Sequence, residues 1–183
     1  MLIGGASGVG KSTLSRQLAN HFQLPLTEVD SFQLILERMT TPEQQPALHF
    51  WRTHPEAMAW PPERILELHL DVGRVIATAL HAVMEDHLAS AAPLILEGDY
   101  ILPEVAAAYP SQVLGLFLDE PDLTQIVDNF SRREPESGQQ TGRAQVSWLY
   151  NEWLRKQCQQ LGVPMLAVRP WDTLLNRALH QVS

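Results

Sequence analysis

The sequence predicts an α/β fold built on a five-stranded, mostly parallel sheet. Short apolar runs bounded by turn residues alternate with longer segments of helical period along the chain. The central runs, at 94–96 and 113–118, are apolar without interruption, as in strands that are covered on both faces. A length of 183 residues with 45% hydrophobic content suffices for one core. We therefore expect one domain spanning 1–183.

The elements follow from apolar runs and from proline and glycine positions. Five strands are expected at 1–4, 25–30, 93–98, 113–119 and 164–168. Helices are expected at 11–22, 62–90, 122–133, 143–161 and 171–182. Pro62 opens the longest helix, while Gly162 and Pro164 end the fourth. Residues 31–61 carry prolines that break any long helix, so 31–90 is expected to be a helical insertion.

Composition excludes several classes of protein. A formal net charge of −8 disfavours a broad electrostatic grip on nucleic acid. Cys158 is the only cysteine, which excludes an internal disulfide framework and a multi-cysteine zinc site. No apolar run reaches about 18 residues, and a glycine-rich loop near residue 1 leaves no room for a signal sequence. We expect a cytoplasmic protein without membrane association.

A phosphate-binding loop is the strongest motif. It fits the pattern GxxxxGK[ST] between an apolar strand and a helix, and it comprises Gly5, Ala6, Ser7, Gly8, Val9, Gly10, Lys11 and Ser12. Backbone N–H groups of this loop and of Thr13, with the positive end of the helix dipole, suit the phosphates of ATP. Lys11 is expected to reach the β- and γ-phosphates, and the Ser12 hydroxyl to bind Mg²⁺. The alternative is a glycine-rich turn that caps a helix.

Carboxylates follow three of the predicted strands. Ligands of parallel α/β sheets bind beyond the carboxyl ends of strands, where Asp30, Glu97 and Asp99 are expected. Asp30 is the candidate base for an acceptor hydroxyl, and Glu97 is a candidate for the magnesium site. Asp30 could instead cap the following helix. Asp119 has only its position at a strand end in favour of a metal role.

A polar, glycine-containing stretch at 132–143 is expected to form a lid. Arg132, Arg133 and Arg143 flank it, and arginines inserted by a lid stabilise the charge that builds up during phosphoryl transfer. The alternative is that these side chains are solvated helix ends that pair with Glu134 or Glu136.

Two further regions carry candidate binding residues. Arg169 and Trp171 follow the last strand and could stack on the base of a nucleotide, although Trp171 could equally pack on the core. The acceptor is expected to bind to 31–90, where Arg52 and Trp60 are the candidates. His69 in the same segment fits a hydrogen-bonded structural residue better than a base.

The order of these motifs resembles a known group of enzymes. A P-loop, then Asp-x-Phe at Asp30, then Glu-Gly at Glu97 is similar to uridine kinase, phosphoribulokinase and pantothenate kinase, and 96–103 is similar to 2-phosphoglycerate kinases. The resemblance implies a three-layer P-loop NTPase fold with a helical substrate-binding insertion and a lid. It also implies Asp30 as the base and Glu97 as a magnesium organiser. Asp99 stands where an apolar residue or histidine is more usual, which indicates a different acceptor.

The leading hypothesis is therefore an ATP- and Mg²⁺-dependent kinase that phosphorylates a hydroxyl of a small molecule, such as a metabolite, nucleoside or antibiotic. A nucleotide-dependent switch is the alternative from another class, although the Asn-Lys-x-Asp motif of GTPases is absent. A polynucleotide kinase would catalyse the same phosphoryl transfer, but the net charge of −8 disfavours binding of a nucleic acid.

Overall fold

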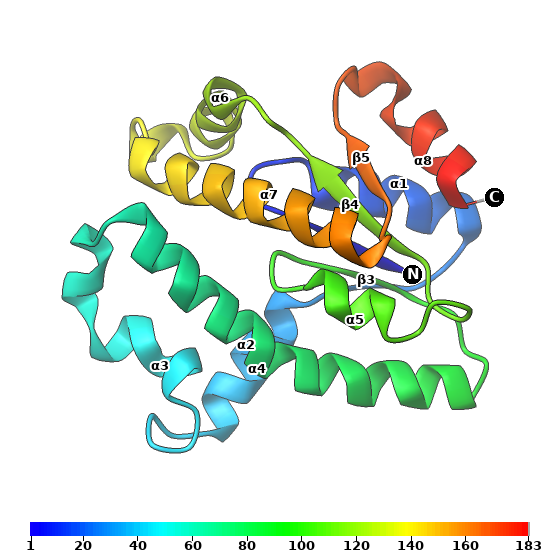
Figure 1. Ribbon diagram of the computed structural model, residues 1–183, viewed down its shortest axis with the longest axis horizontal. Helices are drawn as coiled ribbons and strands as arrows, with labels where there is room; N and C mark the ends of the chain where they lie inside the picture. Colours follow the sequence, from blue (N-terminus) through cyan, green and yellow to red (C-terminus); the bar gives the residue numbers. More distant parts are fainter. Residues whose placement is uncertain (183) are drawn as a thin grey trace.

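A five-stranded parallel sheet forms the centre of the molecule in the computed structural model, which describes residues 1–182 (Figure 1). Its strand order is β2-β3-β1-β4-β5. The strands are β1 (Leu2–Gly5), β2 (Leu26–Glu28), β3 (Ile95–Glu97), β4 (Gly115–Asp119) and β5 (Met165–Ala167). This arrangement confirms the predicted fold class. Ser183, the last residue of the expected domain, lies outside the described residues.

Helices cover both faces of the sheet (Figure 1). On one face α1 (Lys11–Phe22) contacts β1 and β3 and packs beside α8 (Leu174–Val182). On the other, α5 (Pro103–Ala107) and α7 (Thr141–Leu161) contact β4, and α4 (Pro62–Ala89) packs against both helices. Helix α6 (Leu123–Arg133) runs beside α7. The result is a three-layer sandwich with the strands inside.

Burial of the central strands explains their apolar sequence. Leu116, Phe117 and Leu118 are successive residues of β4, and all three are fully buried because successive side chains enter the layers on opposite faces. Each such side chain stabilises the fold by about 1.5–3 kcal/mol. Phe117 lies so close to β1 that a Cβ on Gly4 would sit 2.2 Å from its ring. The core of the sheet therefore requires glycine at position 4.

The segment without an expected long helix contains three short ones. They are α2 (Asp30–Met39), α3 (Pro46–Thr53) and the 3₁₀ helix η1 (Pro55–Ala59). The prolines of this segment lie in first turns or between helices, where a missing N–H costs nothing, so they delimit short helices. Helix α5 also begins at a proline and was not predicted. Two further 3₁₀ turns, η2 (Pro135–Ser137) and η3 (Trp171–Thr173), precede α7 and α8.

Some predicted boundaries were wrong by a few residues. The predicted strand 25–30 ends at Glu28, and Asp30 is the first residue of α2 rather than the end of a strand. The predicted helix 171–182 divides into η3 and α8. The helix at 11–22 has the predicted ends.

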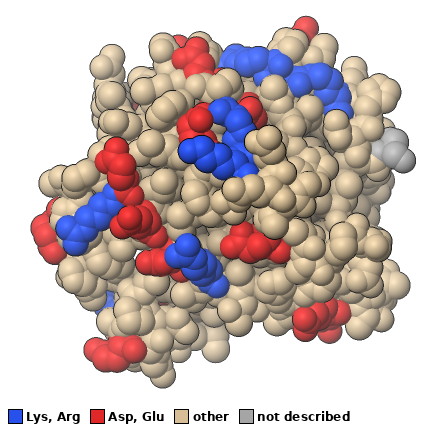
Figure 2. Space-filling model, in the orientation of Figure 1, with Lys and Arg blue, Asp and Glu red and all other residues tan. Residues whose placement is uncertain are grey.

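Among residues 1–182, no helix combines the length and apolar character needed to cross a bilayer. Figure 2 shows Lys and Arg side chains in separate small groups, with acidic side chains among them, on the face drawn there. No continuous basic stripe crosses this face, in keeping with the net charge of −8.

Candidate functional site

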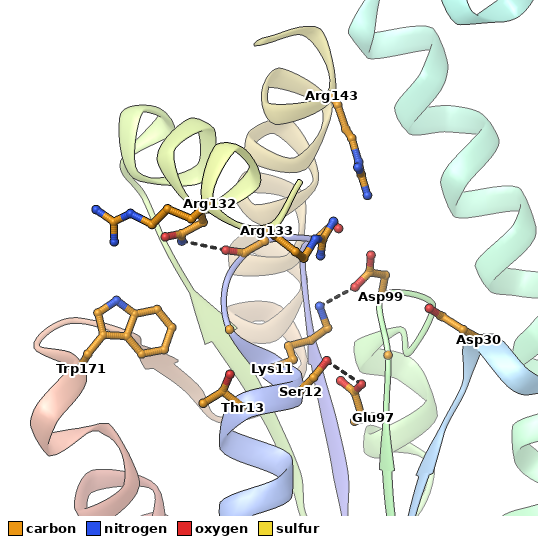
Figure 3. A pocket seen from close by; sticks show the side chains of 15 residues that line it. Lys11, Ser12, Thr13, Asp30, Glu97, Asp99, Arg132, Arg133, Arg143 and Trp171 are labelled. Carbon is orange, nitrogen blue, oxygen red and sulfur yellow. Dashed lines mark hydrogen bonds and ion pairs between the residues drawn. The ribbon is translucent and has the colours of Figure 1, made fainter. Parts of the chain in front are cut away.

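A polar cavity of about 810 Å³ opens at the carboxyl ends of β1 and β3. We call it the P-loop cavity (Figure 3). Its lining combines the glycine-rich loop, acidic residues and arginines: Ser7, Gly8, Gly10, Lys11, Ser12, Thr13, Asp30, Glu97, Gly98, Asp99, Asn129, Arg132, Arg133, Arg143 and Trp171. Most of the residues that the sequence marked as candidates thus lie around one cavity. Gly5, Ala6 and Val9 belong to the same loop but are buried beneath its surface.

The loop adopts a conformation that needs glycine. Gly8 and Gly10 have φ angles of 81° and 92°, in the left-handed region that glycine enters without steric cost. A Cβ on Gly10 would lie 2.0 Å from the Trp171 ring, so that ring packs directly on the loop. Asn129 on α6 donates a hydrogen bond of 2.8 Å to the carbonyl of Gly8. Asn129 was not predicted as a site residue, since its only signal in the sequence is that it lies one helical turn before Arg133.

Lys11 at the start of α1 is buried, with 6% of its surface exposed, and its ammonium group makes two contacts. It donates to the carbonyl of Ala6 at 2.8 Å and forms an ion pair with Asp99. The pair is visible at the centre of Figure 3. A buried cation needs an anionic partner, and here the chain provides it. A nucleotide phosphate that binds Lys11 therefore competes with Asp99.

Ser12 and Glu97 form the predicted magnesium position. The Ser12 hydroxyl donates to Glu97 Oε1 at 2.9 Å, while Glu97 Oε2 is buried without a hydrogen-bond partner among the described residues. Burial raises the pKa of Glu97, with Lys11 opposing this effect. Within residues 1–182 no cluster of three or more His, Cys, Asp or Glu side chains could hold a metal. One carboxylate and one hydroxyl fit Mg²⁺, which takes oxygen ligands and keeps several waters and phosphate oxygens.

Asp30 and Asp99 have opposite electrostatic environments. Burial, followed by the negative charge of Asp99, raises the pKa of Asp30. Burial also acts to raise the pKa of Asp99, but the charge and hydrogen bond of Lys11 overcome it and hold that pKa below its usual value. The cap residue of α2 is Val29, not Asp30, and Asp30 faces the cavity (Figure 3). Two neighbouring carboxylates with diverging pKa values are typical of an acid–base site.

The three arginines of the predicted lid line the cavity, in different ways. Arg133 and Arg143 both pair with Glu134, at 2.9 Å, and the guanidinium of Arg143 lies 4.4 Å from the Phe130 ring centre. This is the pairing that the alternative interpretation anticipated, and it keeps both arginines beside the cavity. Arg143 points toward Lys11 and Asp99 in Figure 3, whereas Arg132 extends over Trp171.

Arg169 and Asp119 do not line the P-loop cavity. Arg169 donates to the buried carboxylate of Glu120 at 3.0 Å, with its guanidinium 5.4 Å from the Trp171 ring. Asp119 accepts hydrogen bonds from Asn151 at 2.8 Å and Arg155 at 2.6 Å. These contacts tie β4 to α7 and to the loop after β5. Only Trp171 of the predicted base-binding pair reaches the cavity.

A second cavity of about 600 Å³ adjoins the first. We call it the aromatic cavity; its lining comprises Ser7, Trp51, Trp60, Pro62, Ile65, His69, Asp99, Tyr100, Gly142, Arg143, Val146, Ser147 and Tyr150. Ser7, Asp99 and Arg143 line both cavities. Of the two acceptor candidates, Trp60 lies here, whereas Arg52 bonds to His49 at 3.0 Å and is not in the lining.

His69 is held between two tyrosines in this cavity. Its ring stacks on Tyr100 with centroids 4.5 Å apart and meets Tyr150 edge-on at 4.4 Å. Burial lowers the pKa of His69, with Asp99 opposing this effect, so the neutral imidazole is favoured. Tyr150 in turn donates a 2.7 Å hydrogen bond to the backbone carbonyl of Asp99. Tyr100 and Tyr150 were not predicted as site residues, since no local motif marks them.

Comparisons with known proteins identify the fold. No protein-family model matches the chain, and no curated protein matches it in sequence. Solved structures do match. A gluconokinase from Sinorhizobium meliloti 1021 is similar with a TM-score of 0.56 at 15% identity, over 99% of this chain and 89% of that one.

Two further matches have the same character. A shikimate kinase from Acinetobacter baumannii in complex with shikimate gives a TM-score of 0.56 at 13% identity, over 99% of this chain and 90% of that one. A sugar kinase from Janibacter sp. HTCC2649 has a TM-score of 0.54 at 18% identity, over 99% of this chain and 92% of that one. At such identities the likeness establishes the α/β fold that these three structures share with this chain. It does not single out the uridine kinase and phosphoribulokinase group.

Proposed function

We propose that this protein is an ATP-dependent kinase that transfers the γ-phosphate of ATP to a hydroxyl of a small molecule. One observation carries the proposal: Lys11, Asp30, Glu97 and the lid arginines surround a single cavity whose floor is the glycine-rich loop. A switch protein needs the loop and a magnesium ligand, but it has no need of a carboxylate poised to accept a proton. The kinase fold of the similar structures supports the same conclusion.

Each group has a defined task in the proposed reaction. Loop N–H groups and Lys11 bind the β- and γ-phosphates, and Trp171 packs beside the nucleotide base. Asp30 accepts the proton of the acceptor hydroxyl. The acceptor oxygen then forms a bond to the γ-phosphorus as the bond from that phosphorus to the β–γ bridging oxygen breaks, leaving ADP. When the lid closes, Arg133 and Arg143 release Glu134 and bind the phosphoryl group that is being transferred.

Ser12 and Glu97 would hold Mg²⁺ together with the nucleotide, since the unpartnered Oε2 of Glu97 provides a free oxygen ligand. The ion supplies charge neutralisation at the phosphates. Residues 31–90 would supply much of the acceptor site, as Trp51, Trp60 and His69 already line the aromatic cavity. The order of the motifs also supports a relationship between this chain and the uridine kinase, phosphoribulokinase and 2-phosphoglycerate kinase group.

The test is ADP formation by the purified chain with ATP and Mg²⁺ across a broad panel of alcohols. An active acceptor should stimulate ADP formation, and Asp30→Asn should reduce the stimulated rate by roughly 10²–10⁴-fold, because the base is lost, while ADP affinity changes little. Asp86→Asn is the matched control, since Asp86 is exposed and lines neither cavity. Equal transfer by Asp30→Asn and wild type would contradict the assigned base, and a panel without any stimulation would count against a kinase.

A further inference from the structure

We infer that the acceptor is an uncharged, ring-bearing alcohol that binds in the aromatic cavity with its hydroxyl beside Asp99. The inference rests on the proposed function, because it requires the P-loop cavity to supply the phosphoryl group. The two cavities share Ser7, Asp99 and Arg143, so a molecule in the second reaches the phosphates in the first. A volume of about 600 Å³ is in the range of sites for small molecules.

Apolar rings form much of the wall of the aromatic cavity. Trp51, Trp60, Tyr100 and Tyr150 come from three separate parts of the chain and converge here, and the aliphatic side chains of Ile65 and Val146 join them. Such surface gains free energy when an apolar ligand face displaces water from it. A flexible polyol without an apolar face would gain little from these contacts. The wall therefore favours a ligand that contains a ring.

The charges of this cavity are already paired within the chain. Apart from His69, whose pKa is lowered by burial, Asp99 and Arg143 are the only acidic and basic side chains of its lining, and they pair with Lys11 and Glu134 respectively. A carboxylate or ammonium group on the ligand would lose its hydration and find no free counter-charge. The cavity therefore selects against a charged acceptor.

Aromatic walls can also bind a cation, but here groups of the chain already lie over two of the rings, Trp60 and Tyr100. The guanidinium of Arg64 lies 3.2 Å from the centre of the Trp60 ring. Tyr100 has its stacked partner in His69, 4.5 Å away. A cationic ligand would meet these groups together with Arg143. An uncharged ligand avoids both conflicts.

Asp99 gives the ligand its orientation. Its carboxylate lies where the two cavities meet, and its backbone is fixed by the 2.7 Å hydrogen bond from Tyr150. The Asp99 carboxylate has lone pairs beyond those that Lys11 uses, so it can accept a hydrogen bond from a ligand hydroxyl while the ion pair persists. This places the hydroxyl between Asp99 and Asp30, whose charges interact.

Three matched probes test the charge preference: 1-phenylethane-1,2-diol, mandelate and 2-amino-1-phenylethanol. They share a ring and a benzylic hydroxyl, and they are neutral, anionic and cationic. Binding to the full chain without nucleotide, in which Asp99 keeps its ion pair with Lys11, is measured by saturation-transfer NMR and titration. The diol should bind at least about tenfold more tightly than either charged probe, because each of these carries a charge that the cavity leaves unpaired. Equal or tighter binding of a charged probe, or no binding of the diol, would overturn the inference.

A charge introduced into the wall of the aromatic cavity tests whether the probes bind there. Val146→Lys introduces a cation into the lining, and Gln145→Lys makes the same change at the neighbouring exposed position of α7. Val146→Lys should lower the preference for the diol over mandelate by at least fivefold, whereas Gln145→Lys should leave it unchanged. Thermal melting verifies that both variants fold. Identical preferences in the two variants would overturn the assignment of the probe to this cavity.

Transfer assays separate this inference from the proposed function. Phosphorylation of a charged acceptor in preference to neutral ring alcohols would refute the acceptor class and leave the kinase intact. Selective diol binding in the aromatic cavity, without phosphoryl transfer to any alcohol, would support the cavity preference and refute the kinase.

Discussion

The P-loop cavity and the aromatic cavity meet at Asp99 but are built in different ways. Much of the first comes from one continuous loop and from residues that immediately follow strands, so short stretches of backbone fix its geometry. The second is assembled from α3, the turn after η1, α4, α7, the segment after β3 and Ser7 of the loop, and depends on how these elements pack. The first is rich in charged groups, whereas rings and aliphatic side chains dominate the second.

This difference separates chemistry from specificity. Phosphate binding needs N–H groups, a cation and a metal ligand at fixed positions, which a local motif provides. Recognition of an acceptor needs a shape, and helices packed at the edge of the sheet can change that shape without disturbing the loop. The residues shared by the two cavities, above all Asp99, are then the points where binding in one affects the other.

The largest expected effect comes from removing the cation of the P-loop cavity. Lys11→Ala should lower the rate of phosphoryl transfer by roughly 1,000-fold, because no other group in the loop offsets the charge that develops on the γ-phosphate. Binding of 1-phenylethane-1,2-diol in the aromatic cavity should change far less, because rings and aliphatic side chains supply most of its contacts there. Rapid-quench transfer assays and NMR titration measure the two quantities.

Lys156→Ala is the matched control, since Lys156 is the only other lysine of the chain and is exposed on α7. Its transfer rate should equal that of wild type. Loss of transfer and of diol binding in parallel for Lys11→Ala would show that the two cavities are not separable in function.

A smaller effect, an increase in ADP affinity, is expected from replacing Asp99, the carboxylate that lines both cavities. Asp99→Asn should make ADP bind about tenfold more tightly, because the phosphates no longer compete with Asp99 for Lys11 and no longer meet its negative charge. The free protein should become less stable, since Lys11 loses its partner. Titration calorimetry with ADP and denaturant unfolding without ligand measure these changes.

Asp71→Asn provides the control for this prediction. Asp71 also pairs with a basic residue, Arg74, at 2.6 Å, but the pair is exposed on α4 and lines neither cavity. ADP affinity should not respond to that change. Unchanged or weaker ADP affinity in Asp99→Asn would contradict the idea that Asp99 links the two cavities.

The fold was predictable because its signals are local and repeated. Five apolar runs separated by helical segments specify a parallel sheet, and all five strands lie at the predicted places. The short helices α2, α3 and α5 escaped prediction, because prolines first read as helix breakers can stand at helix starts. That distinction depends on the tertiary contacts of each segment.

The P-loop cavity was predictable for the same reason, and the aromatic cavity was not. Ser12 and Glu97, 85 positions apart, were both expected at the carboxyl edge of the sheet, and the parallel pairing of β1 with β3 brings them within hydrogen-bond distance. Tyr150 lies in the middle of a helix among other apolar residues, where nothing in the sequence distinguishes a cavity wall from the core. Asp99 was noted only as an unusual residue, since its pairing with Lys11 requires the folded loop.

The smallest effect is expected in the wall of the aromatic cavity. Tyr150→Phe removes one hydrogen bond to the Asp99 carbonyl and keeps the ring. The free energy of unfolding should fall by about 1 kcal/mol, a normal value for one buried hydrogen bond. His69 also bonds to this carbonyl, which therefore keeps a partner and spares the larger cost of an unsatisfied group. The KM for a neutral ring alcohol should rise a few-fold, while ADP affinity should not change.

Tyr109→Phe is the matched control for this last prediction, since the Tyr109 hydroxyl bonds to His81 at 2.9 Å and to Glu85 at 3.2 Å near the surface. An exposed hydroxyl exchanges its partners for water, so the loss of stability should stay below about 0.5 kcal/mol. Urea unfolding of both variants, with KM and ADP affinity measured on the same preparations, tests the prediction for Tyr150→Phe. If Tyr150→Phe weakens ADP binding as much as it raises the acceptor KM, the hydroxyl supports the whole active site rather than the acceptor side of Asp99.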